Sequence, residues 1–146
     1  MNLSTIPVVR LIIQQILNYG VHHIVIAPGS RNSPITVGLI THKKFTTYSI
    51  VDERSAGFFA IGLSQQIRQP VAVLCTSGSA LLNIYPAVSE AYYSRYPLVV
   101  LSADRPTYQI DIGNGQTIRQ SGVFSKHLIS ETSLLQDGES TKNNCK

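Results

Sequence analysis

Glu53 is the residue of this sequence best placed to carry out chemistry. It stands where an apolar segment ends and a stretch of small and apolar residues begins, within residues 51–60. Because the residues that follow are mostly apolar, we expect desolvation to raise the pKa of this carboxyl group. A carboxyl group held near neutrality can share a proton with a ring nitrogen. The alternative is that Glu53 only stabilises the first turn of a helix.

Three further polar turns, each following an apolar segment, could supply the rest of a site. They cover residues 27–34, 75–79 and 102–106. Arg31 and Arg105 each offer a planar guanidinium group that suits a carboxylate or a phosphate. Two such groups at one edge of a sheet favour an anionic small molecule as the ligand. For Arg105 the alternative is a pair with Asp104 that only braces the turn.

Other common kinds of site find little support. Ser77 and Gly78 open a predicted helix, whose free backbone N–H groups are a general feature of anion and small-ligand sites. The glycine and lysine patterns of dinucleotide-binding and phosphate-binding loops are absent. His42 and His127 have no evident partners for a catalytic triad, which disfavours a hydrolase. His22 and His23 are adjacent in the sequence and lack the ligand spacing of a metal site.

The elements that must position these residues alternate between helix and strand. Continuous apolar runs such as residues 23–27 are typical of parallel strands buried on both faces. The alternation predicts an α/β fold, with an open, mainly parallel sheet and helices on both faces. Strands are expected over 23–27, 46–51, 70–75 and 98–103. A first helix is expected to end at Gly20. Further helices are expected over 33–41, 53–68 and 78–93, the last with a kink or break at Pro86. A short helix is expected around 116–122.

Composition limits the class of protein. A length of 146 residues with 43% hydrophobic residues is enough for one domain with a core. Only 14% of residues are charged, against roughly 25% in typical soluble domains, which indicates either a surface covered by another chain or a Ser/Thr/Gln-rich surface.

The net charge of +4 is not clustered, so we expect no nucleic-acid partner. No apolar stretch approaches the roughly 20 residues of a membrane span. Cys75 and Cys145 are expected to be free thiols in a reducing, cytoplasmic compartment.

The order of the motifs resembles one enzyme family. The motifs are APGSRNSP at 27–34, DERSAGFFA at 52–60, CTSGSA at 75–80, YPAV at 85–88, ADRP at 103–106 and QTIRQ at 116–120. They resemble the N-terminal, pyrimidine-binding (PYR) domain of the thiamine-diphosphate-dependent 2-succinyl-5-enolpyruvyl-6-hydroxy-3-cyclohexene-1-carboxylate synthases of menaquinone biosynthesis. The resemblance assigns residues 1–130 to that domain. It leaves 131–146 as a polar tail, either disordered or a truncated linker.

The resemblance implies roles for individual residues. Glu53 is the catalytic residue, whose carboxyl group hydrogen-bonds N1′ of the cofactor's aminopyrimidine and so activates the cofactor. Cofactor contacts besides Glu53 are implied for Pro28, Ser77, Gly78 and Asn83. Contacts to isochorismate are implied for Ser30, Arg31, Arg105 and Gln116. In the family, Asn often precedes the glutamine that matches Gln116, whereas this chain has Gly115 there. One side-chain contact to substrate or cofactor is therefore either missing or supplied by Asn114.

The resemblance also implies a reaction and partners. The whole enzyme decarboxylates 2-oxoglutarate and adds the succinyl-semialdehyde carbanion to isochorismate. Mg2+ and the diphosphate bind in a C-terminal domain of the opposite subunit, so we expect no metal ligands in this chain and no activity from it alone. We also expect a homo-oligomer with Phe58, Phe59, Tyr92 and Tyr93 in its interface, unless these aromatic residues fill the core.

Two other interpretations stay open. The chain could be a free-standing PYR subunit of a two-chain thiamine-dependent 2-oxoacid decarboxylase. It could instead be a non-catalytic α/β ligand-binding module, although such a module has no need of Glu53. A Glu53→Gln change separates these cases. Turnover falls if the carboxyl group is catalytic, and turnover is unchanged if the group is only structural.

Overall fold

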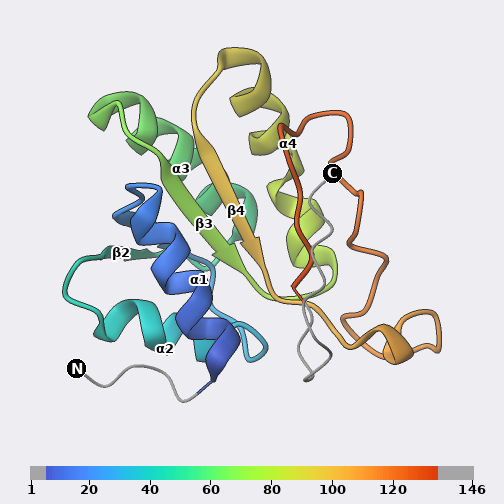
Figure 1. Ribbon diagram of the computed structural model, residues 1–146. Coiled ribbons are helices and arrows are strands. Elements are labelled where there is room, and N and C mark those ends of the chain that lie inside the picture. The colour runs from blue at the N-terminus through green and yellow to red at the C-terminus, as the bar shows by residue number, and fades with distance from the viewer. Residues whose placement is uncertain (1–5, 135–146) are drawn as a thin grey trace.

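The computed structural model describes residues 6–134 of the chain, which form one open sheet of four parallel strands flanked by helices (Figure 1). The strands are β1 (His23–Ile26), β2 (Thr46–Ser49), β3 (Val71–Cys75) and β4 (Leu98–Ser102). The α-helices are α1 (Pro7–Asn18), α2 (Ser33–Thr41), α3 (Glu53–Ile67) and α4 (Ser79–Ser94). The strand order is β2-β1-β3-β4. The predicted α/β class with a parallel sheet is therefore confirmed.

Helices cover both faces of the sheet because alternate residues of a strand point to opposite sides. On β3, Val71, Val73 and Cys75 belong to the core that packs on α3 and α4. Ala72 and Leu74 belong to the core that packs on α1 and α2. All five residues are fully buried, which explains why this strand reads as a continuous apolar run in the sequence.

The strand order creates a crevice at the carboxyl ends of β1 and β3. The chain leaves β1 toward β2 on one side and leaves β3 toward β4 on the other. In open α/β sheets, ligands bind where neighbouring connections diverge in this way. The two turns that leave β1 and β3 contain predicted site residues at 28–31 and 77–78. The fold thus gives these turns a place at the edge where a ligand is expected.

Helices α3 and α4 pack closely because Gly57 has no side chain. A Cβ atom at Gly57 would lie 2.7 Å from the Cβ of Ala87. Residues four apart on a helix share a face. Glu53 precedes Gly57 by one turn and Asn83 precedes Ala87 by one turn, so the same contact brings these two polar side chains together.

We expect Gly57→Ala to lower the free energy of unfolding by about 1–3 kcal/mol, because the added methyl group overlaps Ala87. The matched control is Gly62→Ala in the same helix, where nothing lies within 4 Å of the added Cβ. That change is expected to stabilise the chain by about 0.5–1 kcal/mol. Urea denaturation measures both. Equal stability of the two variants would contradict the close approach of α3 and α4.

Two details of the predicted secondary structure are wrong. The short helix expected around 116–122 is absent, and a 3-10 helix at Thr107–Gln109 lies in the preceding segment instead. Gln116 has a φ of 55° and Gly122 a φ of 75°, and this left-handed backbone does not continue an α-helix. Of the kink or break expected at Pro86, the break is absent, because helix α4 continues through the proline.

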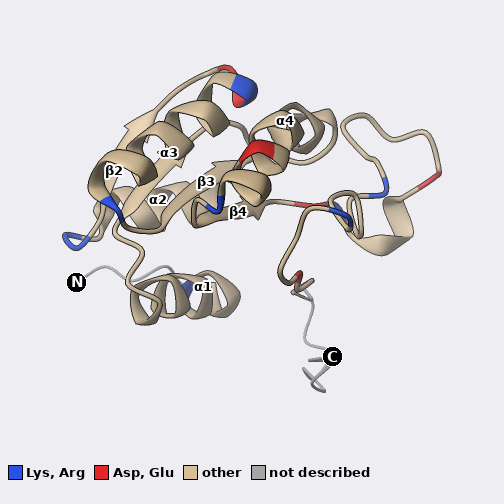
Figure 2. Ribbon diagram, turned by 90° about the horizontal axis from the view of Figure 1, so that it is seen from above, with Lys and Arg blue, Asp and Glu red and all other residues tan. Residues whose placement is uncertain are grey.

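The surface of the described residues agrees with a modest, dispersed charge. In Figure 2 the Lys and Arg residues are scattered over several elements and do not gather on one face of residues 6–134. Within the same residues, no helix has the length and apolar character that a membrane span requires. Most of the tail predicted over 131–146, including Cys145, lies outside the described residues.

Candidate functional site

The turns after β1 and β3 are in direct contact. The amide of Ala27 donates a hydrogen bond of 2.8 Å to the carbonyl oxygen of Leu74, which ties the two strand ends together. A Cβ atom at Gly29 would lie 2.5 Å from the Cβ of Thr76, so only glycine fits between the turns. Pro28 precedes this contact and is exposed. The predicted gathering of these two turns at one edge of the sheet is therefore present.

Glu53 begins α3, as predicted, and the residue before it, Asp52, caps the helix. The helix is capped by Asp52, whose Oδ1 accepts a hydrogen bond of 2.7 Å from the amide of Ser55. That hydrogen bond holds the pKa of Asp52 below its ordinary value. Because Asp52 already caps the helix, capping is not what Glu53 is needed for. The dipole of α3 still favours a negative charge at Glu53 in the first turn, so the alternative that Glu53 only stabilises the helix start stays open.

The surroundings of Glu53 combine one polar partner with small buried groups. Asn83 Nδ2 donates a hydrogen bond of 3.4 Å to Oε2 of Glu53. Oε1 accepts no hydrogen bond from the described residues. Glu53 itself is half-buried, and Ala56 and Gly57 behind it are buried. Phe58 and Phe59, which were also expected to shield Glu53, are exposed.

Cys75, at the end of β3, is a buried free thiol. Burial, with a smaller contribution from the negative charge of Glu53, raises the pKa of this thiol to about 12. The Cys75 thiol therefore stays protonated near neutral pH.

We expect Cys75 to react with iodoacetamide roughly a thousandfold more slowly in the folded chain than in denaturant at pH 8, because so little thiolate is present. A Cys145→Ser background leaves Cys75 as the only thiol, and mass spectrometry counts the label. The unfolded thiol ionises first as the pH rises above about 9, so this group favours unfolding at alkaline pH. Labelling at similar rates in both states would contradict the raised pKa.

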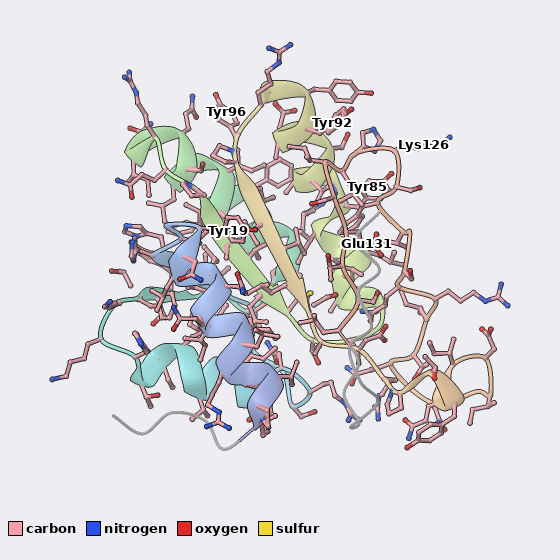
Figure 3. All side chains as sticks on the ribbon, in the orientation of Figure 1. Tyr19, Tyr85, Tyr92, Tyr96, Lys126 and Glu131 are labelled. Atoms are coloured by element: carbon pink, nitrogen blue, oxygen red, sulfur yellow. The ribbon has the colours of Figure 1, made fainter. Side chains whose placement is uncertain are left out.

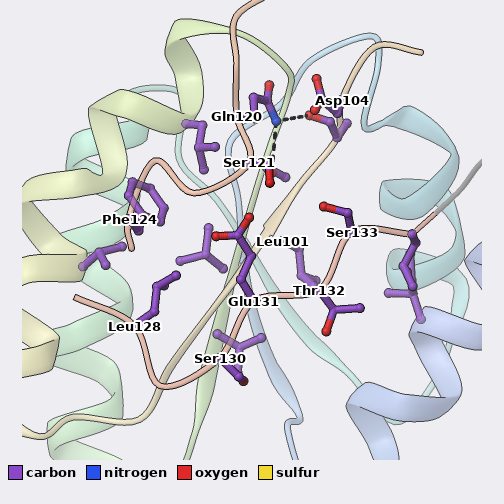
Figure 4. A pocket seen from close by; sticks show the side chains of 18 of the residues that line it. Leu101, Asp104, Gln120, Ser121, Phe124, Leu128, Ser130, Glu131, Thr132 and Ser133 are labelled. Carbon is purple, nitrogen blue, oxygen red and sulfur yellow. Dashed lines mark hydrogen bonds between the residues drawn. The ribbon is translucent and has the colours of Figure 1, made fainter. Parts of the chain in front are cut away.

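Ser30, Arg31 and Arg105 line a single groove of about 1950 Å3 that runs along β4. Figure 4 shows the part of this groove near Leu101, Asp104 and Gln120. Three of the four residues predicted to contact the substrate therefore line one groove, whose wall also includes residues of α1, α4 and segment 119–134. Two guanidinium groups and a hydroxyl in one groove suit an anionic molecule that also carries hydroxyl groups.

Arg105 is held by the segment that follows it. Its Nη2 donates a hydrogen bond of 3.3 Å to the carbonyl oxygen of Gly115. The carboxylate of Asp104 accepts a hydrogen bond of 2.7 Å from the main-chain amide of Arg105, and burial raises the pKa of Asp104. The turn is thus braced through the main chain, while the guanidinium group reaches toward Gly115.

Ser77, Gly78 and Gln116 form a second group beside this groove. Ser77 Oγ donates a hydrogen bond of 3.0 Å to the carbonyl oxygen of Gln116. A Cβ atom at Gly78 would lie 2.9 Å from the backbone of Gln116. Gln116 is exposed, and Asn114, the suggested substitute for a missing asparagine, is exposed as well. Apart from Pro28, the predicted site residues thus fall into three groups: Glu53 with Asn83, the arginine groove, and this group.

Sequence reasoning missed two buried amides at the same edge of the sheet. Asn32 is fully buried and donates a hydrogen bond of 2.9 Å from Nδ2 to the carbonyl oxygen of Ala27. Gln120 is buried and joins the ends of β3 and β4. Both residues stand in polar segments, and no feature of a single sequence distinguishes a buried amide there from an exposed one.

Three buried polar atoms at this edge have no hydrogen-bond partner among the described residues: Asn32 Oδ1, Thr76 Oγ1 and Arg105 Nε. Buried polar atoms are nearly always paired in folded proteins. A fourth such atom, Thr36 Oγ1, lies on α2. A buried water molecule or a polar ligand would satisfy atoms of this kind. In residues 6–134 no three His, Cys, Asp or Glu side chains gather as a metal site would require.

Four aromatic side chains of α3 and α4 are exposed. Phe58, Phe59, Tyr92 and Tyr93 are 45%, 43%, 44% and 72% exposed, so they are not simply core residues. His127 lies beside them, its ring centroid 5.7 Å from that of Tyr92. Figure 3 shows Tyr85 and Tyr92 on the side of α4 that faces the segment carrying Lys126.

Comparisons with known proteins identify the family of the chain. Residues 6–128 match the family model described as thiamine pyrophosphate enzyme, N-terminal TPP binding domain. The chain is similar to proteins named 2-succinyl-5-enolpyruvyl-6-hydroxy-3-cyclohexene-1-carboxylate synthase. It is 55% identical to that of Christiangramia forsetii over 94% of this chain and 24% of the relative. For Flavobacterium psychrophilum the identity is 57% over 90% of this chain and 24% of the relative, and for Bacteroides fragilis 58% over 73% and 19%.

The extent of these matches limits what they show. The chain spans about a quarter of the length of the curated relatives, whereas the family model covers nearly all of its described residues. The resemblance to an N-terminal thiamine-binding domain is thereby confirmed. This chain belongs to the family of N-terminal TPP binding domains of thiamine pyrophosphate enzymes.

Proposed function

We propose that this chain supplies the pyrimidine-binding half of the thiamine diphosphate site of a 2-succinyl-5-enolpyruvyl-6-hydroxy-3-cyclohexene-1-carboxylate synthase. The observation that carries the proposal is Glu53, a half-buried carboxylate with one open oxygen at the edge of the sheet where ligands bind. The whole enzyme acts in menaquinone biosynthesis: it decarboxylates 2-oxoglutarate and joins the remaining fragment to isochorismate. The high identity to synthases of that name supports this reaction.

The residues of this chain fit an aminopyrimidine ring. Glu53 Oε1 is free to share a proton with a ring nitrogen, and Asn83 Nδ2 holds Oε2 from the other side. The buried, protonated thiol of Cys75 and the small residues at the start of α3 provide the apolar environment that favours a shared proton. Bound thiamine diphosphate supplies a stabilised carbanion equivalent for decarboxylation and carbon–carbon bond formation. Pro28, Ser77, Gly78 and Asn83 border the ring in this proposal.

The arginine groove fits isochorismate. This substrate carries two carboxylates and a hydroxyl group, and Arg31, Arg105 and Ser30 offer two guanidinium groups and one hydroxyl in one groove. The Nε of Arg105 is buried and has no hydrogen-bond partner among the described residues. Gln116 lies next to this groove through the bond between Arg105 and Gly115. We propose all four residues as contacts to isochorismate.

The remaining parts of the enzyme are proposed to lie outside this chain. Mg2+, the diphosphate and most contacts to 2-oxoglutarate belong to a C-terminal domain, in keeping with the fraction of the relatives that the chain covers. The exposed aromatic side chains of α3 and α4 support a homo-oligomer. The PYR domain is proposed to extend to about residue 130, near the end of the matched region. The free thiol of Cys75 supports a reducing, cytoplasmic location.

The isolated chain is expected to give no product from isochorismate and 2-oxoglutarate, even with thiamine diphosphate and Mg2+. The physical reason is that the metal and the diphosphate are proposed to bind in a C-terminal domain outside this chain. Product formation is followed by mass spectrometry. Turnover by the chain alone would contradict the proposal that it is only half of a site, and would favour a self-sufficient enzyme.

Activity can be studied in a chimaera in which this chain replaces the matching N-terminal quarter of the C. forsetii synthase. The identity of 55% over 137 residues makes compatible packing a reasonable expectation. Mixing the isolated chain with other thiamine-dependent subunits tests the two-chain alternative. Failure of the chimaera together with activity in such a mixture would favour the free-standing subunit over the synthase.

A further inference from the structure

Gln120 joins two strand ends through a single buried side chain. It is 7% exposed. Its Oε1 accepts a hydrogen bond of 2.7 Å from the amide of Gly78, at the start of α4. Its Nε2 donates to the carbonyl oxygen of Ala103 at 3.0 Å and to Ser102 Oγ at 3.3 Å, and Figure 4 shows bonds leaving this amide. The side chain therefore uses three of its four hydrogen-bonding positions.

The segment that Gln120 anchors contains a strained residue. Gln116 has a φ of 55°, a left-handed conformation that side-chain-bearing residues rarely adopt. It lies against Gly78, which has a φ of 81° and leaves no room for a Cβ. Ser77 Oγ holds the carbonyl oxygen of Gln116. Such strain persists only where surrounding contacts fix it, and it concentrates at functional sites.

The same segment also sets the position of Arg105. The carbonyl oxygen of Gly115 accepts the hydrogen bond from Arg105 Nη2. Gly115 is exposed, and a Cβ atom at this position would meet nothing within 4 Å. Gly115 is thus placed by the backbone on either side of it rather than by its own packing. The nearest buried side chain in the following residues is that of Gln120.

We propose that Gln120 is a positioning residue that holds segment 114–120 against the turn between β3 and α4, so that Gln116 and Arg105 face the anionic substrate. The effect on substrate rests on the proposed function, whereas the link between Gln120 and the segment does not. Gln120 also accepts the hydrogen bond of the Gly78 amide. The substrate is therefore recognised by side chains and not by that N–H group.

Amide hydrogen exchange on this chain tests the link directly. Gln120→Met keeps the length of the side chain and removes all three hydrogen bonds, and Gln66→Met on the exposed face of α3 is the matched control. We expect exchange at Gly78 and over 114–120 to accelerate at least about tenfold, while β1 stays within about twofold of the parent. Unchanged exchange at Gly78 and 114–120 would overturn the proposal. An equal acceleration in β1 would also overturn it, because Gln120 would then serve only overall stability.

A second variant keeps the test informative if Gln120→Met does not fold. In Gln120→Glu, a neutral carboxyl group has one acceptor for Gly78 and one donor for Ala103, whereas the ionised group has no donor. Exchange over 114–120, expressed relative to the parent chain at the same pH, should be near the parent value at about pH 5 and faster at about pH 8. Gln66→Glu controls for the added charge. A ratio that does not change with pH would contradict the role given to the Ala103 bond.

Kinetics of the chimaera test the consequence for the substrate. Gln120→Glu at about pH 8 should raise the KM for isochorismate about tenfold and leave the KM for thiamine diphosphate within about twofold. A fall in kcat with both KM values unchanged would mean that Gln120 only maintains the amount of folded enzyme, and would overturn the positioning role. If the parent chimaera is inactive, the proposed function fails, and the exchange experiment still decides the role of Gln120.

Discussion

Replacing Glu53 with glutamine in the chimaera is expected to lower kcat by about 10²- to 10⁴-fold, the usual contribution of a general acid–base group. The amide has the same shape as the carboxyl group, and its oxygen can still face Asn83 Nδ2. It cannot share a proton with a ring nitrogen, so only the chemistry is lost. Because Asp52 caps the helix, the free energy of unfolding should stay within about 0.5 kcal/mol of the parent.

Initial rates of product formation, together with urea denaturation, measure the effect of Glu53→Gln. Glu90→Gln on α4 is the matched control, since Glu90 is exposed and, within residues 6–134, accepts a hydrogen bond only from Ser94 in its own helix. The control should keep full activity. If Glu53→Gln is folded and turns over at the parent rate, Glu53 is a structural carboxylate and the assignment of the site is wrong.

Replacing Arg105 with methionine is expected to lower kcat/KM for isochorismate about 100-fold, equivalent to roughly 2.7 kcal/mol. Methionine keeps most of the apolar length of the side chain but loses the charge, the bond to Gly115 and the donor that has no partner among the described residues. A charged hydrogen bond to a carboxylate is worth about this much when water is excluded. Arg105→Lys should recover only part of the loss, because an ammonium group cannot form two parallel bonds to one carboxylate.

The steady-state parameters for both substrates separate the role of Arg105 from a general loss of structure. Arg10→Met on the exposed surface of α1 provides the control for loss of a positive charge. The KM for 2-oxoglutarate should not change in Arg105→Met. Equal changes for both substrates would show that Arg105 does not belong to the isochorismate groove.

Most of the fold could be predicted because its elements carry strong local signals. The buried strands β1 and β3 are continuous apolar runs, and the helix that starts at Glu53 follows a strong capping residue. The turns after the strands were correctly expected to gather, since the carboxyl ends of parallel strands share an edge. The failure at 116–122 has a physical cause: the contact with Gly78 holds Gln116 in a left-handed conformation, and that contact spans about forty residues of sequence.

The residues that sequence reasoning missed depend on such long-range contacts. Nothing around Gln120 indicates that its side chain is buried between the ends of β3 and β4. The pairing of Glu53 with Asn83 follows from the approach of Gly57 to Ala87, which only the packed helices reveal. The roles of the individual site residues stay predictions, because they depend on molecules that bind at this edge.

Product formation by the chimaera tests the central claim most directly. This chain replaces the matching quarter of the C. forsetii synthase, and the folded protein is assayed with isochorismate, 2-oxoglutarate, thiamine diphosphate and Mg2+. The account predicts turnover within about tenfold of the C. forsetii enzyme, a loss of no more than about 1.4 kcal/mol of transition-state stabilisation. A folded chimaera that forms no product would contradict the claim that this chain supplies the pyrimidine-binding half of the synthase.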